Sequence, residues 1–228
     1  MTNQTTTITN LEELSGIFST IVDPGGQDEY LIEEIHKWCV KNNYNKQEVF
    51  EALVDQAKTS LNNDEERLKK FACVLGLFYH YGIGTPHRKK KAFKWYTRAA
   101  NSGDPFGMNQ LGWCYSIPFG TDQDYEKSIH WTKKSAFLGN PSGACNLANA
   151  YQHGTKIGKN DVKSFLWYKY AANAGVLNAQ INMACCYRVG LGTFKNMHEA
   201  LRWYRIASKH PKNTRNIMNL IFAWRWLR

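Results

Sequence analysis

The sequence repeats with a period of 36 residues, and no other feature constrains the fold as strongly. Four copies align between residues 71 and 213 without an insertion or a deletion. In the first half of each copy, Leu or Met is followed by Gly or Ala and then by a tyrosine. In the second half, a small residue precedes a tryptophan. The tyrosines are Tyr79, Tyr115, Tyr151 and Tyr187, and the tryptophans are Trp95, Trp131, Trp167 and Trp203.

Each copy has the pattern of two amphipathic helices joined by a turn. In PFGMNQLGWCY, Leu111 and Tyr115 fall on one helical face with Gly112 beside them. In KKAFKWYTRAA, the predicted inward stripe is Ala92, Phe93, Trp95 and Ala99. Such a pair buries its apolar face by stacking on its neighbours, so we expect an all-α fold, an α-solenoid forming a right-handed superhelix.

These columns resemble Sel1-like repeats, which are close relatives of the tetratricopeptide repeat. The resemblance covers about residues 71–213 and holds in four copies in phase. It implies a non-enzymatic scaffold or adaptor, of the kind that serves in signalling and protein-quality-control assemblies. Pro118 departs from the pattern, because Gly82, Gly154 and Gly190 stand at this turn position in the other copies. We therefore expect an altered turn there.

The predicted organisation places the repeats between two helical covers. We expect a disordered tail over residues 1–10 and an acidic helical leader over residues 11–70, which runs into the first repeat helix. The predicted repeats span residues 71–105, 106–141, 142–177 and 178–213, followed by a C-terminal capping helix over residues 214–228. Terminal repeats need such covers because one of their faces has no neighbouring repeat.

The charge changes sign along the chain. Residues 1–70 contain seven basic and 13 acidic residues, whereas residues 71–228 contain 22 and six. The first part is therefore net negative and the second strongly positive, which marks a boundary near residue 70. The N-terminus lacks a secretion signal and no run of 18 apolar residues occurs, so we expect a cytoplasmic monomer without a membrane span.

No arrangement of reactive side chains predicts catalysis. The six cysteines form no C-x-x-C motif, and we expect them to be reduced core residues. The seven histidines occupy scattered repeat positions without a matching nucleophile and carboxylate. We accordingly predict no catalytic residue, no bound cofactor and no metal.

A partner-binding groove is predicted along the first helices of the repeats. The resemblance implies that positions near the recurring Leu and Tyr face inward, where they can contact a protein or peptide. Carried over by repeat position, the groove residues are His80, Tyr81, Phe106, Asn109, Trp113, Ser116, Asn149, Gln152, His153, Asn178 and Arg188. Asn and Gln can bind a peptide backbone, and Trp and Arg are frequent anchors of interfaces.

A basic patch in the first repeat leaves other functions open. It comprises Arg88, Lys89, Lys90, Lys91, Lys94 and Arg98. The stretch GIGTPHRKKKAFKWY suggests a phosphate loop, but it recurs in all four copies as an inter-helix turn, which indicates architecture instead. A solvated outer wall is one interpretation of the charge. The alternatives are binding of RNA or of an acidic protein or membrane surface, and regulation of a kinase-like protein as its companion.

Overall fold

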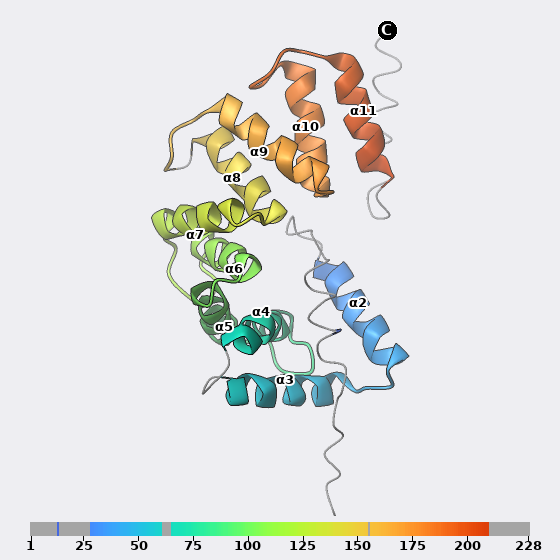
Figure 1. Cartoon of the computed structure of the whole chain (residues 1–228), viewed down its shortest axis with the longest axis vertical. Coiled ribbons are helices and arrows are strands. Elements are labelled where there is room, and N and C mark those ends of the chain that lie inside the picture. The colour runs from blue at the N-terminus through green and yellow to red at the C-terminus, as the bar shows by residue number, and fades with distance from the viewer. Residues whose placement is uncertain (1–12, 14–27, 61–64, 155, 210–228) are drawn as a thin grey trace, which may run out of the picture. The chain divides into compact units, whose positions relative to one another are not determined.

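The protein is built from α-helices. The computed structural model describes Glu13 and residues 28–60, 65–154 and 156–209, and this part of the chain contains ten helices and no strand (Figure 1). It divides into two compact units between Leu138 and Gly139. The predicted all-α array of helix–turn–helix repeats is confirmed. The tail over residues 1–10 and the capping helix over residues 214–228 lie outside the described residues, and the proposed segment boundaries stay predictions.

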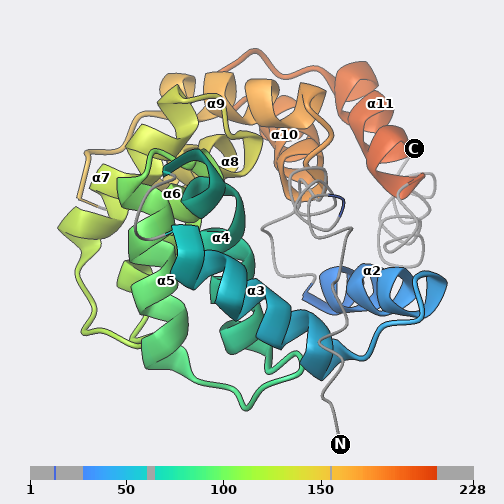
Figure 2. The ribbon, with the colours of Figure 1, turned by 60° about the horizontal axis from the view of Figure 1, so that its bottom comes forward.

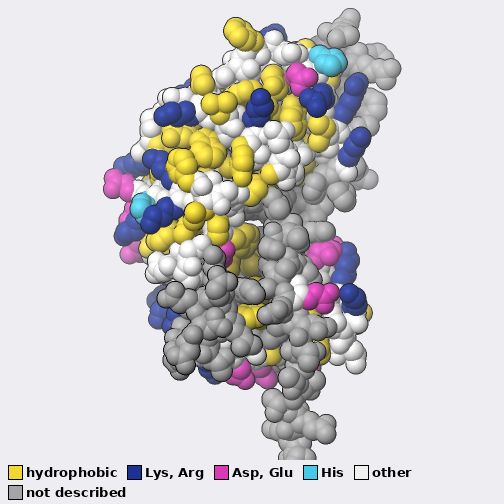
Figure 3. All heavy atoms as spheres, viewed as in Figure 1, with side chains coloured by type: hydrophobic (Ala, Val, Ile, Leu, Met, Phe, Trp, Pro, Cys, Tyr) yellow, Lys and Arg dark blue, Asp and Glu magenta, His cyan; other side chains and the backbone are white. Residues whose placement is uncertain are grey.

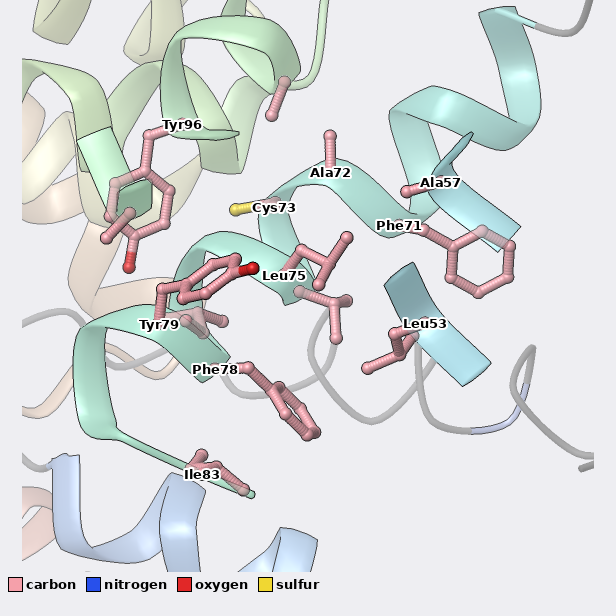
Figure 4. Packing of buried hydrophobic residues seen from close by; sticks show 14 of the residues in the cluster. Leu53, Ala57, Phe71, Ala72, Cys73, Leu75, Phe78, Tyr79, Ile83 and Tyr96 are labelled. Carbon is pink, nitrogen blue, oxygen red and sulfur yellow. The ribbon is translucent and has the colours of Figure 1, made fainter. Parts of the chain in front are cut away.

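The first unit contains two repeats preceded by two further helices. Consecutive helices from α3 to α7 pack against one another (Figure 2). The described helices of this unit are α2 (Asp28–Lys41), α3 (Lys46–Ser60), α4 (Glu65–Tyr81), α5 (Lys89–Asn101), α6 (Pro105–Ser116) and α7 (Tyr125–Phe137). Side chains from α3, α4 and α5 meet in its core, as Figure 4 shows for Leu53, Phe71 and Tyr96.

The second unit contains the other two repeats. Helix α9 packs against both α8 and α10, and α10 packs against α11. Its described helices are α8 (Pro141–His153), α9 (Asp161–Asn173), α10 (Leu177–Val189) and α11 (Met197–Ser208).

Capping side chains define where most second helices begin. Asp124, Asn160 and Asn196 precede α7, α9 and α11, and each side chain accepts a hydrogen bond from a backbone N–H of the first turn. Arg88 stands at the same repeat position before α5 and makes no such bond. Helix α5 therefore begins without a side-chain cap and with three lysines in its first residues, which is unfavourable beside the positive helix end.

The buried face of the second helices differs from the predicted stripe. Phe93 and Trp95 are half-buried, because they lie at the edges of the face that contacts the neighbouring helices. The fully buried positions follow the spacing i, i+4, i+7 and i+8, which forms one side of an α-helix. In α5 they are Ala92, Tyr96, Ala99 and Ala100.

Tyr96 packs directly onto a glycine of the first helix. A Cβ atom added to Gly76 would lie 2.5 Å from both Cδ1 and Cε1 of the Tyr96 ring, which is closer than non-bonded carbon atoms approach. In the next repeat, a Cβ on Gly112 would lie 2.7 Å from Oγ1 of Thr132, the residue at the Tyr96 position. The recurring small residue thus permits close approach of the two helices in a repeat.

Glycines in the turns connect successive repeats. Gly84, Gly120 and Gly192 have positive φ angles, and a Cβ on any of them would collide with the carbonyl oxygen of a preceding helix's first residue. Lys156 takes the same turn position in the third repeat with a φ of 60°. The expected change around Pro118 is present: α6 ends at Ser116, and Ile117 is extended, because proline cannot adopt the positive φ of Gly82.

The cysteines occupy mainly core positions. All six are free thiols, and five are buried, whereas Cys185 is half-buried. Burial raises the pKa of the Cys114 and Cys186 thiols to about 12, so both are neutral near pH 7. Burial, with a smaller effect from Asp104, also raises the pKa of Cys73. The prediction of small core residues fits this placement.

The contact between the Gly84 turn and α3 can be tested with matched glycine substitutions. Gly84 and Gly103 have φ angles of 62° and 84°, but only Gly84 has neighbours within 4 Å of an added Cβ. Gly84→Ala should therefore lower the free energy of unfolding by about 1–3 kcal/mol more than Gly103→Ala, measured by urea denaturation. Equal losses would show that strain at positive φ, and not contact with α3, explains the glycine.

Candidate interaction surface

His80 lies at the centre of an aromatic cluster in the first unit. Its ring stacks on Tyr81, with centroids 4.2 Å apart and planes 12° apart, and on Trp113, with centroids 5.1 Å apart. The ring centroid of Phe119 lies 4.3 Å from that of His80 and 4.9 Å from that of Trp113. Nδ1 of His80 also lies 3.0 Å from the buried hydroxyl group of Tyr96. We call His80, Tyr81, Trp113 and Phe119 the His80 cluster.

The cluster combines residues from α4, α6 and the turn after α6. Trp113, Tyr81 and His80 are half-buried, so each ring exposes part of its surface while its neighbours hold it in place. Three residues of the predicted groove are thus brought together. The exposed parts of these rings can pack against apolar or aromatic groups of another molecule.

Other predicted groove residues of the first unit make contacts within the protein. Asn109 is only 1% exposed, so this side chain cannot line an open surface as expected. The same repeat position is also buried in the first and third copies, where it holds Cys73 and Cys145, so this side of the first helices faces the core. Ser116 donates a hydrogen bond to the carbonyl oxygen of Trp113, and Phe106 packs half-buried against the hydrophobic core.

Two predicted groove residues of the second unit bind a buried tyrosine. The Tyr168 hydroxyl lies 2.5 Å from Oδ1 of Asn149 and 2.6 Å from Oε1 of Gln152. A hydroxyl has one proton and two lone pairs, so Tyr168 can donate to one amide and accept from the NH2 group of the other. Burial, with smaller effects from Cys145 and Cys186, raises the pKa of Tyr168 well above its usual value.

The fourth repeat has the same arrangement with different side chains. The Tyr204 hydroxyl lies 3.2 Å from Sγ of Cys185. Burial and the Cys185 contact raise the pKa of Tyr204 to about 12, while Arg188 acts in the opposite direction through its charge and a hydrogen bond. Asn178 is half-buried and His153 is exposed in this unit.

A shared contact therefore explains several of the predicted groove residues. His80, Gln152 and Arg188 occupy the same repeat position, and each contacts the second-helix tyrosine of its own repeat. Asn149 and Cys185 share another position and contact the same tyrosines. Part of their polar capacity is used inside the repeat, which leaves the aromatic His80 cluster as the strongest candidate for contact with a partner.

Phe119 and the second-helix tyrosines were not predicted from the sequence as parts of this surface. Phe119 lies in a turn, but its repeat position carries Ile83 and Leu191 in other copies, and this apolar recurrence was a usable signal. The tyrosine position was visible as Tyr96, Tyr168 and Tyr204. Nothing in the spacing indicated which first-helix side chains their hydroxyl groups would meet.

The basic patch divides into recurring and local charges. The Nζ atoms of Lys91, Lys127 and Lys163 each lie 5.1–5.5 Å from the ring centroid of the tyrosine twelve residues earlier. Arg98 lies over Trp95, as Lys134 lies over Trp131. These cation–π contacts recur between repeats, so Lys91, which the sequence placed in the basic patch, has a structural role.

The local charges of the patch are Arg88, Lys89, Lys90 and Lys94. All four are exposed, and Lys89 lies over the Phe119 ring at 5.6 Å. Among the described residues, no ion pair includes any member of the basic patch. Helix α5 also lacks acidic residues, so its positive charge is not neutralised locally.

Comparison with known proteins identifies the repeats. The model of the Sel1 repeat matches residues 71–104, 105–140, 141–176 and 177–211. The chain belongs to the Sel1 repeat family. Sel1-repeat proteins generally serve as protein-interaction scaffolds and are typically non-catalytic. A comparison with curated proteins gave no match.

Solved structures support the same fold. A Sel1 repeat protein from Oxalobacter formigenes is 21% identical with a TM-score of 0.65, and the match covers 81% of this chain and 49% of that protein. A protective antigen present in uropathogenic Escherichia coli strains, which displays an SLR fold, is 25% identical with a TM-score of 0.61. That match covers 71% of this chain and 34% of the antigen, so this Sel1-repeat chain spans less than half of either protein.

Two further observations bear on partner type. No helix in the described ranges has both the length and the apolar character needed to cross a bilayer. Exposed His198 lies 4.0 Å from Glu199 on the surface of α11.

The buried tyrosine of the fourth repeat predicts a specific loss of stability at high pH. Because the pKa of Tyr204 is raised in the folded protein, its contribution is present below about pH 10 and is lost as the pH rises toward 12. Tyr204→Phe should therefore flatten the fall of the urea midpoint between about pH 9 and 11.5. Tyr125→Phe, which changes an exposed tyrosine, is the control. An unchanged slope in Tyr204→Phe would contradict the contribution of this hydroxyl.

Proposed function

We propose that this Sel1-repeat protein is a non-enzymatic adaptor that binds a protein or peptide partner through its first-helix face. The His80 cluster carries the proposal, and Trp113 is the principal anchor. We further propose that the protein acts as a cytoplasmic monomer in signalling or in the assembly of protein complexes.

The His80 cluster supports binding because its rings are ordered before a partner arrives. Tyr81, Phe119 and Trp113 all contact the His80 ring, and His80 is itself held by the Tyr96 hydroxyl. Little side-chain entropy is then lost when an apolar group of the partner packs against Trp113. Tryptophan and tyrosine are also the side chains that contribute most often to binding energy in interfaces.

The polar residues of the second unit would have a secondary role in this proposal. Asn149 and Gln152 each use one polar atom of the side-chain amide on the Tyr168 hydroxyl, but an amide retains further hydrogen-bonding capacity. They could therefore bind a peptide backbone only with the groups that Tyr168 does not use. Their substitution would also disturb the interior, which makes them poor probes of binding.

A second candidate function is binding of RNA or of an acidic protein or membrane surface by α5. The exposed charges of Arg88, Lys90 and Lys94 favour it, because they have no acidic partner among the described residues. Arg88 also stands where the other second helices have a capping side chain, so this position carries a positive charge in place of a residue that would stabilise the helix.

Selection from a displayed library of random peptides tests the adaptor proposal. The purified protein should enrich related peptides, and Trp113→Ala should weaken the enriched peptide about tenfold or more. Tyr81→Ala is the second variant, because it removes a stacked ring that lies at the edge of the cluster. Both should retain the helical circular-dichroism spectrum. Val40→Ser, which changes an exposed apolar residue of α2, is the control and should bind normally.

Two results would contradict the adaptor proposal. One is undiminished peptide binding by both aromatic variants. The other is ligand binding that falls steeply with salt and is lost when Arg88, Lys90 and Lys94 are replaced by glutamate, because counterion release accompanies binding to a polyanion. That second result would instead assign the ligand to the basic surface of α5.

A further inference from the structure

The outer face of α9 carries an exposed apolar stripe. Val162, Leu166 and Tyr170 are 58%, 56% and 44% exposed, and their spacing of four residues places them on one helical face. Figure 3 shows hydrophobic side chains gathered over the region of α8 and α9. We call these three residues the α9 stripe.

The α9 stripe is specific to the third repeat. The corresponding positions are Lys90, Lys94 and Arg98 in α5, Glu126, His130 and Lys134 in α7, and His198, Arg202 and Ile206 in α11. Eight of these nine side chains are polar or charged, which is the usual pattern for the solvent-facing side of a helix. The stripe is therefore not a requirement of the repeat, and an exposed apolar row of this kind marks an interaction surface.

Contacts within the second unit hold the largest member of the stripe in place. The Tyr170 hydroxyl donates a hydrogen bond of 2.9 Å to the carbonyl oxygen of Gly139. Its ring also makes an edge contact with Trp167, with centroids 6.3 Å apart and planes at 82°. Tyr170 is thus an ordered aromatic anchor with nearly half of its surface exposed.

The surroundings of the α9 stripe are positively charged. Lys163 and Lys169 are exposed on the same helix. Residues 139–209 contain nine Lys or Arg and two acidic residues, Asp161 and Glu199. Both acids already have cationic neighbours, because Asp161 lies 3.6 Å from Lys159 and Glu199 lies 3.2 Å from Arg202. The uncompensated charge beside the stripe is therefore basic.

We propose that the α9 stripe docks an amphipathic helix of a partner protein, whose apolar face is bordered by acidic residues. The stripe extends over about 12 Å, which matches anchors placed one and two turns apart on such a helix. Acidic borders would complement Lys163 and Lys169. This site is separate from the His80 cluster and does not depend on the function proposed for it.

A second copy of the chain fits the α9 stripe less well than such a helix. A symmetric dimer would place the same surface on both sides of the interface, so that Lys163 and Lys169 of one copy face the lysines of the other. Like charges brought together in this way oppose association. An acidic partner avoids this repulsion, because its carboxylates attract Lys163 and Lys169.

An NMR titration with synthetic peptides tests the proposal. The probe is a helical peptide of about 16 residues, with leucine along one face at i, i+4 spacing and glutamate along both borders. It should shift backbone amide signals of α9, chiefly those near Val162, Leu166 and Tyr170. The double variant Val162→Lys/Leu166→Lys gives α9 the side chains that α5 has at these positions, and it should weaken binding about tenfold or more.

Controls separate the stripe from other surfaces. Val40→Lys changes an apolar residue of α2 that is 67% exposed, and it should leave binding unchanged, as should Trp113→Ala. A peptide with lysine borders in place of glutamate should bind about tenfold more weakly. Equal binding of the two peptides, equal binding by the double variant, or shifts outside α9 would each overturn the proposal. So would a wild-type dimer that the double variant converts to monomer, because a second copy would then be the occupant.

Discussion

The close approach of Tyr96 to Gly76 is the contact on which the rest of the first repeat depends. With no side chain at Gly76, the aromatic ring of α5 reaches the backbone of α4 and becomes fully buried. The two helices then present their remaining apolar residues to α3 and α6. In the second unit, Ala148 and Ala184 stand at the glycine position, and Tyr168 and Tyr204 are again buried. The repeat is thus organised around a small residue and a large one.

This packing brings the end of the tyrosine ring to the first-helix face. The hydroxyl groups of Tyr96, Tyr168 and Tyr204 each contact a different polar side chain of the first helix. The side chains on that face are therefore partly determined by contacts with buried tyrosines. In the first unit the neighbour is His80, and the surrounding rings form an ordered aromatic surface. The exposed side of the second helices is less constrained by packing. There the third repeat has the apolar α9 stripe, whereas the first repeat has Lys90, Lys94 and Arg98 at these positions.

The fold was predictable because helix pairs of constant length place equivalent residues in equivalent environments. The same reasoning placed His80, Tyr81 and Trp113 on one face, but could not show that Asn109 is buried or that Asn149 points to Tyr168. The burial of Asn109 depends on how the neighbouring helices pack, and the direction of Asn149 depends on side-chain rotation. The residue spacing alone specifies neither. Lys91 is a similar case. Lysine recurs at this position as Lys127 and Lys163, but the sequence does not show that each ammonium group lies over a tyrosine ring.

A double-mutant cycle between positions 76 and 96 tests the central packing contact most directly. Gly76→Ala should lower the free energy of unfolding by about 1–3 kcal/mol, because the added methyl group collides with the Tyr96 ring. In a Tyr96→Ala background the collision is absent, so the same change should be neutral or stabilising by up to about 1 kcal/mol through the higher helix propensity of alanine. Urea denaturation of the four proteins measures both values. An equal cost in the two backgrounds would contradict the account.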